Sequence, residues 1–577
     1  MRRILGFLRP YKKLIAVTLV AMVLDVAGGL LIPTITANII NYGITGGNMA
    51  YVLQQGLLMT AVALVTSGGA LAGSYLCSDL AARLGRDIRN ALYDKSLEFS
   101  STDMETIGTG SMITRTLSDV NMVQQSLVMF IQMILPVPAV CVMGIVMAFL
   151  LNARMGWILA GVTAVILLMA VLVMRYAAPL FERLQRFLDR MNVVIRENVT
   201  GVRVIRAFGK ERYEEERMRG VFGDYEEVSI RVNRLFAGLD CTALLVINLV
   251  IVVILYVGGN QVGAGAMAIG DITALTEYAI MILFYVIMAQ MVMIMMPRAL
   301  VCARRIQEVL DLAPEITDGP GRSEETSDSD SVLEFRQVGF RFADADEETL
   351  SGLDFACRRG ETTAIIGSTG SGKSTIAKLI LRFHDVTRGS VRLCGADLRE
   401  LTQEELRRRI AYVPQKAWLF SGTIADNLRY GDEAAGEEEM WHALSVAQSD
   451  FVRELPEGLQ SRVAQGGTNF SGGQKQRLSI ARALMKKADL YIFDDSFSAL
   501  DFKTDAALRK ALAAETRDAA VLIIAQRIST ILNADRIIVL EDGRVAGMGT
   551  HEELLESCPV YQDIARSQMK GDDPYGR

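Results

Sequence analysis

The most informative stretch of this sequence is Gly367-Ser-Thr-Gly-Ser-Gly-Lys-Ser-Thr375. It follows the apolar run Ala364-Ile-Ile366, which is typical of a buried strand. Together they fit the pattern G-x-x-x-x-G-K-[ST] between a strand and a helix, in which backbone amides turn toward phosphate groups. We predict that the whole stretch binds ATP and Mg²⁺, through Gly367, Ser368, Thr369, Gly370, Ser371, Gly372, Lys373, Ser374 and Thr375. Lys373 would place a charge at the β- and γ-phosphates, and Ser374 would ligate Mg²⁺.

A second strand ends in two carboxylates. Leu490-Tyr-Ile-Phe493 is apolar and is followed by Asp494 and Asp495. An acidic residue at the end of a buried strand is what a Mg²⁺–nucleotide site requires, so we predict that Asp494 binds the metal. Short apolar runs alternate with helical stretches throughout this part of the chain, which predicts an α/β domain over residues 332–577.

Composition excludes several classes of protein. The chain has 577 residues, enough for several domains, and 51% of them are hydrophobic, which excludes a disordered chain. Seven cysteines in so long a chain do not form a disulfide scaffold. The net charge of -6 gives no support for binding nucleic acid.

The apolar residues gather in long blocks in the first half of the chain. A helix that spans a bilayer needs roughly 20 mostly apolar residues. We predict six such helices at Leu14–Ile40, Tyr51–Ser78, Met122–Leu151, Met155–Met174, Leu235–Val257 and Ile272–Met296. They define a transmembrane domain over residues 1–310, and the acidic, Gly- and Ser-containing stretch 311–331 is predicted to be a linker.

Basic residues predict the orientation in the membrane. The amino terminus and the two long connections are rich in Lys and Arg, whereas the turns Asn41–Ala50 and Gly258–Asp271 contain none. By the positive-inside rule, both termini, the long connections and the α/β domain are cytoplasmic. The connection from Arg175 to Arg234 has helical periodicity, so we expect the membrane helices to continue into the cytoplasm.

Further motifs resemble those of one family. Asn469-Phe-Ser-Gly-Gly-Gln474 resembles the L-S-G-G-Q signature of ATP-binding-cassette proteins, with Phe470 in place of Leu. Gln415 matches the Q-loop, Asp501 matches the D-loop, and Phe342 stands where the family has a Tyr that stacks on adenine. Over essentially its whole length the chain resembles an exporter-type half-transporter, with six membrane helices fused to one nucleotide-binding domain.

The resemblance implies roles for these residues. Gln415 would act in catalysis and at the metal, and a further set would contact nucleotide: Phe342, Ser471, Gly472, Gly473, Gln474 and Asp501. In this family each ATP lies between the P-loop of one domain and the signature of the other. The stretches around Thr109–Asp119 and Gly201–Glu211 resemble the two cytoplasmic connections that bear the coupling helices.

The sequence departs from the family pattern at the catalytic positions. A Glu that polarises water normally follows the Mg²⁺-binding Asp, and a His normally follows the strand Val521–Ala525. Here these residues are Asp495 and Gln526. A carboxylate displaced by about 1 Å can cost ~10²-fold in rate, and Gln cannot titrate near pH 7. We therefore expect a degenerate site and a heterodimer, in which a partner half-transporter supplies the Glu and the His. A slow homodimer is the alternative.

The transported substrate is harder to predict. The sixth helix is rich in Met and aromatic residues, which suit varied apolar ligands but equally suit packing against lipid or other helices. Asp25 lies within a predicted span, where a carboxylate is costly and suggests function. The candidate substrate residues are Asp25, Tyr278, Phe284 and Met288.

The leading hypothesis is a multi-pass protein of a bacterial inner or plasma membrane that exports small amphipathic compounds of the multidrug type. One alternative keeps the fold and reverses the direction, because some exporter-like folds import siderophores. Another is a nucleotide-sensing regulator or channel, which would usually carry longer regulatory insertions than the stretch 311–331.

Overall fold

A computed structural model describes residues 2–321, 330–342 and 345–569 of the chain. These form two compact units, which are described separately. A helical unit comprises Met1–Leu97 and Ile107–Leu312, and an α/β unit comprises Glu98–Thr106 and Ala313–Arg577. The α/β unit thus includes most of the short helix α4 (Ser101–Ile107), although α4 falls within residues 1–310, which the sequence predicts as the transmembrane domain. The predicted domain boundaries stay a prediction. Residues 322–329 of the predicted linker lie outside the described residues.

Among its described residues the helical unit contains six helices long and apolar enough to cross a membrane, as predicted. Its α-helices are α1 (Arg2–Gly6), α2 (Lys12–Asn38), α3 (Met49–Glu98), α5 (Thr109–Thr114), α6 (Val120–Met129), α7 (Pro136–Leu151), α8 (Ala153–Ala207), α9 (Glu211–Gly263) and α10 (Ile269–Asp311). Short π-helical turns at Ile39–Ile44, Arg115–Asp119 and Phe130–Ile134 continue these helices.

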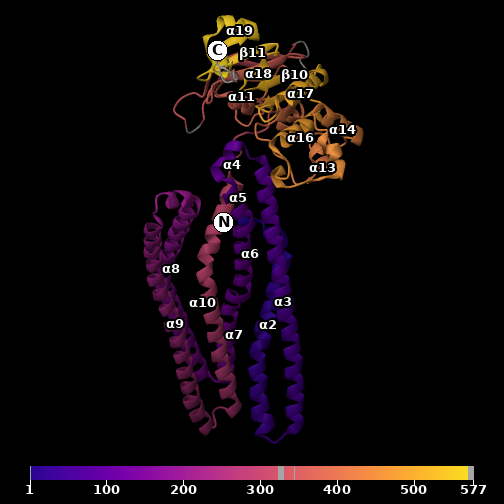
Figure 1. The fold of residues 1–577 in the computed structure, drawn as a ribbon. Helices are drawn as coiled ribbons and strands as arrows, with labels where there is room; N and C mark the ends of the chain where they lie inside the picture. Colours follow the sequence, from indigo (N-terminus) through magenta and orange to yellow (C-terminus); the bar gives the residue numbers. More distant parts are fainter. Residues whose placement is uncertain (1, 322–329, 343–344, 570–577) are drawn as a thin grey trace. The chain divides into compact units, whose positions relative to one another are not determined.

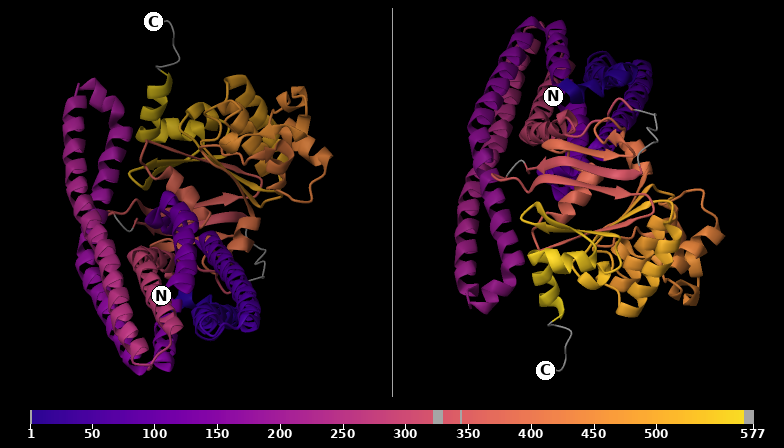
Figure 2. Two further views of the ribbon diagram at one scale, coloured as in Figure 1. Left: turned by 90° about the horizontal axis from the view of Figure 1, so that it is seen from below. Right: turned by 90° about the horizontal axis from the view of Figure 1, so that it is seen from above.

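The long connections are helical. Helix α8 has 55 residues, which at 1.5 Å per residue is about 80 Å and far more than a bilayer requires. It runs beside α9, and the two are joined by a turn in which Gly209 has a left-handed backbone (φ 59°) (Figures 1 and 2). The membrane helices therefore extend well beyond the hydrocarbon layer, as the periodicity of Arg175 to Arg234 predicted.

One buried core of the helical unit is formed by residues of α2, α7, α8, α9 and α10. Leu30, Tyr278 and Ile282 are almost completely buried there. Gly144 of α7 allows the close approach, because a β-carbon at that position would lie 3.0 Å from the Ile282 side chain. Close packing between small and large residues is how membrane helices associate without a hydrophobic driving force from water.

The described part of the α/β unit has two main sheets, and its fold class is the predicted one. Four strands pair antiparallel in the order β2-β1-β4-β5, and six strands pair in the order β12-β11-β3-β10-β9-β6. The strands are β1 (Ser331–Phe340), β2 (Leu350–Arg358), β3 (Thr362–Gly367), β4 (Arg388–Leu393), β5 (Ala396–Asp397), β6 (Ile410–Val413), β7 (Gly422–Thr423), β8 (Arg462–Val463), β9 (Leu490–Asp494), β10 (Ala520–Ile524), β11 (Arg536–Glu541) and β12 (Arg544–Gly549).

Helices cover the larger sheet (Figure 2). Besides α4, the described helices of the α/β unit are α11 (Lys373–Ile380), α12 (Gln403–Arg408), α13 (Ile424–Arg429), α14 (Glu437–Val446), α15 (Phe451–Glu454), α16 (Gly472–Leu484), α17 (Phe502–Glu515), α18 (Ile528–Ile531), α19 (His551–Ser557) and α20 (Pro559–Met569). Of these, α13 and α14 pack against α16. Strands β9 and β10 are buried at every position, which explains why they read as continuous apolar runs.

Candidate nucleotide-binding site

Parallel pairing brings the predicted motifs to one edge of the larger sheet. Strand β10 lies between β3 and β9, and β6 lies on the far side of β9, all of them parallel. Ile524 at the end of β10 pairs with Ile365 of β3 and with Asp494 of β9. The segments that follow these four strands therefore start at the same edge, where ligands of such sheets bind. The P-loop follows β3, and Gln526 follows β10. Asp495 follows β9, and Gln415 follows β6.

The P-loop is shaped for an anion. Gly370 and Gly372 have left-handed backbones with φ of 88° and 95°, and a β-carbon at Gly372 would collide with the Leu350 side chain. Lys373 donates through Nζ to the carbonyl oxygens of Gly367 and Ser368, at 2.7 and 2.6 Å. Burial lowers the pKa of this ammonium group. The loop thus holds a buried ammonium group, and the negative charge of a bound phosphate would stabilise its charged form.

A hydroxyl in the same loop lacks a partner. Ser371 is buried, and its Oγ makes no hydrogen bond to any described residue. A buried unpaired hydroxyl is costly unless a ligand satisfies it. Together with the buried Lys373 it fits the phosphate groups of ATP.

Asp494 is suited to a divalent cation. It is buried at the end of β9, and the Tyr412 hydroxyl donates to its Oδ2 over 3.4 Å. Burial raises the pKa of Asp494, and the charge of Asp495 adds to the rise. A bound Mg²⁺ would offset both effects, so the residues fit the predicted metal.

Asp495 and Gln415 lie together. The Gln415 Nε2 donates to Asp495 Oδ2 over 3.3 Å. Asp495 has a left-handed backbone (φ 47°), which Asp tolerates better than most residues, and its amide donates to the Ile524 carbonyl at 2.7 Å. Burial raises the pKa of Asp495. The structure therefore brings together the two side chains predicted as the Q-loop residue and as the substitute for the family's Glu.

Gln526 has an exposed side chain just beyond β10. Its carbonyl oxygen accepts a hydrogen bond from Gln568 Nε2 at 2.7 Å. Gln568 lies near the carboxyl end of the chain, and no sequence pattern marked it.

The signature residues begin helix α16. Ser471 caps the helix, because its Oγ accepts from the Gln474 amide at 3.3 Å while Gln474 Oε1 accepts from the Ser471 amide at 2.9 Å. Asp501 caps α17 in a similar way, accepting from the amide and the hydroxyl of Thr504. Ser471, Gly472 and Asp501 are exposed. Their predicted contacts with nucleotide across a dimer stay predictions.

The predicted adenine contact, Phe342, packs in an aromatic group. Its ring is 4.8 Å from that of Phe340 and 5.4 Å from that of His384, both edge to face. His384 in turn lies 3.1 Å from the Thr102 hydroxyl of α4, measured from Nδ1. This explains why α4 belongs to the α/β unit.

The candidate substrate residues have different surroundings in the helical unit. Tyr278 is completely buried and its hydroxyl lies 2.6 Å from that of Thr34, so it packs α10 against α2. Phe284 is exposed, while Asp25 and Met288 are partly buried. Their role in substrate binding stays a prediction.

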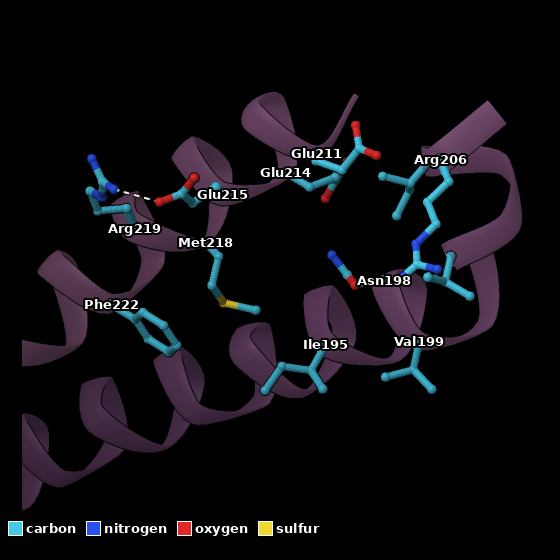
Figure 3. A pocket seen from close by; sticks show the side chains of 12 residues that line it. Ile195, Asn198, Val199, Arg206, Glu211, Glu214, Glu215, Met218, Arg219 and Phe222 are labelled. Atoms are coloured by element: carbon cyan, nitrogen blue, oxygen red, sulfur yellow. Dashed lines mark hydrogen bonds and ion pairs between the residues drawn. The ribbon is translucent and has the colours of Figure 1, made fainter. Parts of the chain in front are cut away.

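A hollow also lies between α8 and α9 near their shared turn (Figure 3). Ile195, Val199, Met218 and Phe222 line its apolar part, and Arg219 pairs with Glu215 at its rim. It contains none of the predicted site residues.

Comparison with known proteins identifies the family. Residues 14–287 match the ABC transporter transmembrane region, and residues 350–498 match the ABC transporter domain. The chain belongs to the ABC transporters. An ABC transporter ATP-binding protein of Mycobacterium tuberculosis is 38% identical over 97% of each chain. The YfiB ABC transporter ATP-binding protein of Bacillus subtilis is 34% identical over 99% of each chain.

Two further comparisons concern exporters. An ATP-dependent lipid A-core flippase of Aromatoleum aromaticum is 30% identical, covering 98% of this transporter and 96% of the flippase. The solved structure of a bacterial Atm1-family ABC exporter with ATP bound has a TM-score of 0.82 at 24% identity, covering 98% and 99% of the two chains. The transporter therefore has the ABC exporter fold, and its ATP-binding domain implies ATPase activity.

Proposed function

We propose that this transporter is the degenerate-site half of a heterodimeric exporter. The observation that carries the proposal is the pair Asp495 and Gln526, which occupy the edge of the sheet where the family has Glu and His. The P-loop, Asp494, Gln415 and the signature residues Ser471–Gln474 match the family pattern. Such a chain would hold ATP with little hydrolysis and complete the partner's site with its own signature.

The residues of this chain have definable tasks in that scheme. Lys373 and the P-loop amides would hold the phosphates, and Ser374, Asp494 and Gln415 would hold Mg²⁺. The metal supplies positive charge that neutralises the phosphate oxygens. Asp495 reaches less far than Glu by one methylene, and its carboxylate already accepts from Gln415. Gln526 can donate to a γ-phosphate without changing its own charge.

Restoring the family residues tests the proposal. The unmodified full chain, purified alone in lipid nanodiscs, should hydrolyse ATP slowly. Asp495→Glu combined with Gln526→His should raise the rate between about tenfold and hundredfold, because a carboxylate about 1 Å out of place costs that much. Adding Lys373→Ala should abolish the gain. Rapid hydrolysis by the unmodified chain alone would contradict the degenerate-site assignment.

For the cargo, we infer a small amphipathic compound that moves from the cytoplasm or the inner leaflet outward. Support comes from the exporter fold and from a relative named as an ATP-dependent lipid A-core flippase. The cytoplasmic position of the α/β unit and both termini follows from the basic residues. Efflux of an amphipathic dye from cells that express the transporter, with and without Lys373→Ala, tests the direction. Uptake would favour an importer, and ATP-gated leakage would favour a channel.

A further inference from the structure

We propose that Gln568 is a positioning residue for the switch segment, defined as Gln526, Arg527 and Ile528. The inference rests on the proposed assignment of Gln526 to the γ-phosphate. It concerns a helix remote in sequence from every nucleotide motif.

One amide group bridges the two sides of this segment. Gln568 Nε2 donates to the Gln526 carbonyl oxygen at 2.7 Å, and Gln568 Oε1 accepts from the Ile528 amide at 2.8 Å. Both distances are those of normal hydrogen bonds. A single side chain therefore fixes the peptide groups on either side of Arg527.

The segment needs such support because regular structure ends there. Strand β10 ends at Ile524, and α18 begins at Ile528. The Ile528 amide is the first of that helix and has no acceptor within it. The residue before it, Arg527, provides no side-chain cap. Gln568 supplies the missing acceptor from another helix.

A second side chain holds the far end of α18. Arg509 of α17 donates through Nη1 to the carbonyl oxygens of Ser529 and Thr530, at 3.1 and 2.9 Å. Arg509 is itself fixed by Asp505, with which it forms an ion pair at 3.0 Å. These bonds hold α18 itself, whereas Gln568 holds the Gln526 carbonyl group, so we expect the orientation of Gln526 to depend on Gln568.

Helix α20 is firmly attached where it presents Gln568. Tyr561 is completely buried and its hydroxyl lies 2.7 Å from His551 Nδ1, and Ala565 is buried in the same core. Gln568 is thus held on a packed helix rather than on a loose terminus. Groups that position reacting atoms work best on such rigid elements.

Loss of the hydrogen bonds from Gln568 should affect only the binding of nucleotides that carry a γ-phosphate. Losing the bridge would free the backbone of Gln526 while leaving the P-loop unchanged. We therefore expect Gln568→Ala to weaken binding of ATP and not of ADP. A purely structural role in the carboxyl-terminal helix would weaken both or neither.

Equilibrium binding to the full chain in lipid nanodiscs tests this, with Mg²⁺ and either ADP or the non-hydrolysable analogue AMP-PNP. Gln568→Ala should lower the AMP-PNP affinity about three- to tenfold and change the ADP affinity less than about twofold. Gln568→Glu, which keeps the acceptor for Ile528, should have a smaller effect. The matched control is Gln562→Ala in the same helix, which loses hydrogen bonds to Leu555 and Glu556 and should change neither affinity.

Gln526→Ala separates the two assignments. It should lower the AMP-PNP affinity selectively, and combining it with Gln568→Ala should add little, because both act on one contact. If Gln526→Ala is selective and Gln568→Ala is not, the positioning role is wrong and the proposed function stands. If Gln526→Ala leaves both affinities unchanged, the assignment of Gln526 fails and the inference fails with it.

Discussion

At the residue scale, Lys373 shows how the site is arranged for its ligand. Its ammonium group is buried and donates to two carbonyl oxygens of its own loop. Burial of a cation disfavours the charged form, which is why its pKa is lowered. A bound phosphate would place a negative charge beside the ammonium group and stabilise it. Lys373 should therefore stabilise the nucleotide-bound state more than the free state.

Lys373→Ala should therefore weaken binding of Mg–ATP about 10- to 150-fold, because a charge-assisted hydrogen bond contributes about 1.5–3 kcal/mol. Titration with a fluorescent ATP analogue measures this. Lys510→Ala, which removes an exposed Lys from α17, is the control and should bind normally. Equal binding by both variants would contradict the P-loop assignment.

Some residue roles could be predicted from sequence and others could not. The P-loop, Asp494 and Gln526 are marked by strands that precede them, and parallel strands end at one edge whatever their loops do. Gln568 carries no such mark, because its partners are backbone groups about forty residues away. Periodicity likewise places Tyr278 on a helix, but it cannot predict that the hydroxyl groups of Tyr278 and Thr34 form a hydrogen bond.

At the element scale, α4 shows that hydrophobic periodicity cannot predict which unit a short helix packs with. Six apolar blocks predicted the membrane helices, since the bilayer imposes length and apolarity on each of them. The short α4 has too few residues for a periodic signal, and its place in the α/β unit depends on tertiary contacts. Thr102 contacts His384, and Asp103 Oδ2 accepts from the Glu315 amide at 3.2 Å.

The contact between α4 and His384 should be sensitive to acid. Burial lowers the pKa of His384, the charge of Lys378 adds to this, and Glu315 and Glu105 oppose it. The unfolded chain therefore takes up the proton first, near pH 6.5. Stability from this group is present above that pH and is lost as the pH falls toward the lowered value.

Thermal unfolding of the full chain at pH 7.5 and 5.5 checks this. His384→Gln should reduce the difference between the two midpoints. Thr102→Val removes the hydrogen bond but no titrating group, so it should lower both midpoints, by roughly 2–4 °C for a loss of about 1 kcal/mol. An unchanged acid sensitivity in His384→Gln would show that other groups control it.

At the scale of the whole molecule, the proposed asymmetry makes this chain's signature act on another chain's ATP. Ser471→Ala should then lower hydrolysis by the complex with a competent half-transporter at least about tenfold, although this chain's own P-loop is untouched. The substitution also removes a helix cap, which by itself costs about 1 kcal/mol of stability. Thr550→Ala is the matched control, because Thr550 caps α19 with the same pair of hydrogen bonds to Glu553.

The measurement is ATP turnover by the co-purified complex in proteoliposomes, together with the affinity of this chain for ATP. Ser471→Ala should lose turnover and keep its own ATP affinity, whereas Thr550→Ala should keep both and lose only stability. Measuring turnover and ATP affinity separately distinguishes a heterodimer from a homodimer. In a homodimer each of the two sites would combine Asp495 and Gln526 with the Ser471 of the other copy, so its turnover would already be low. Full turnover in a Ser471→Ala complex would mean that the signature of this chain does not serve the hydrolysing site.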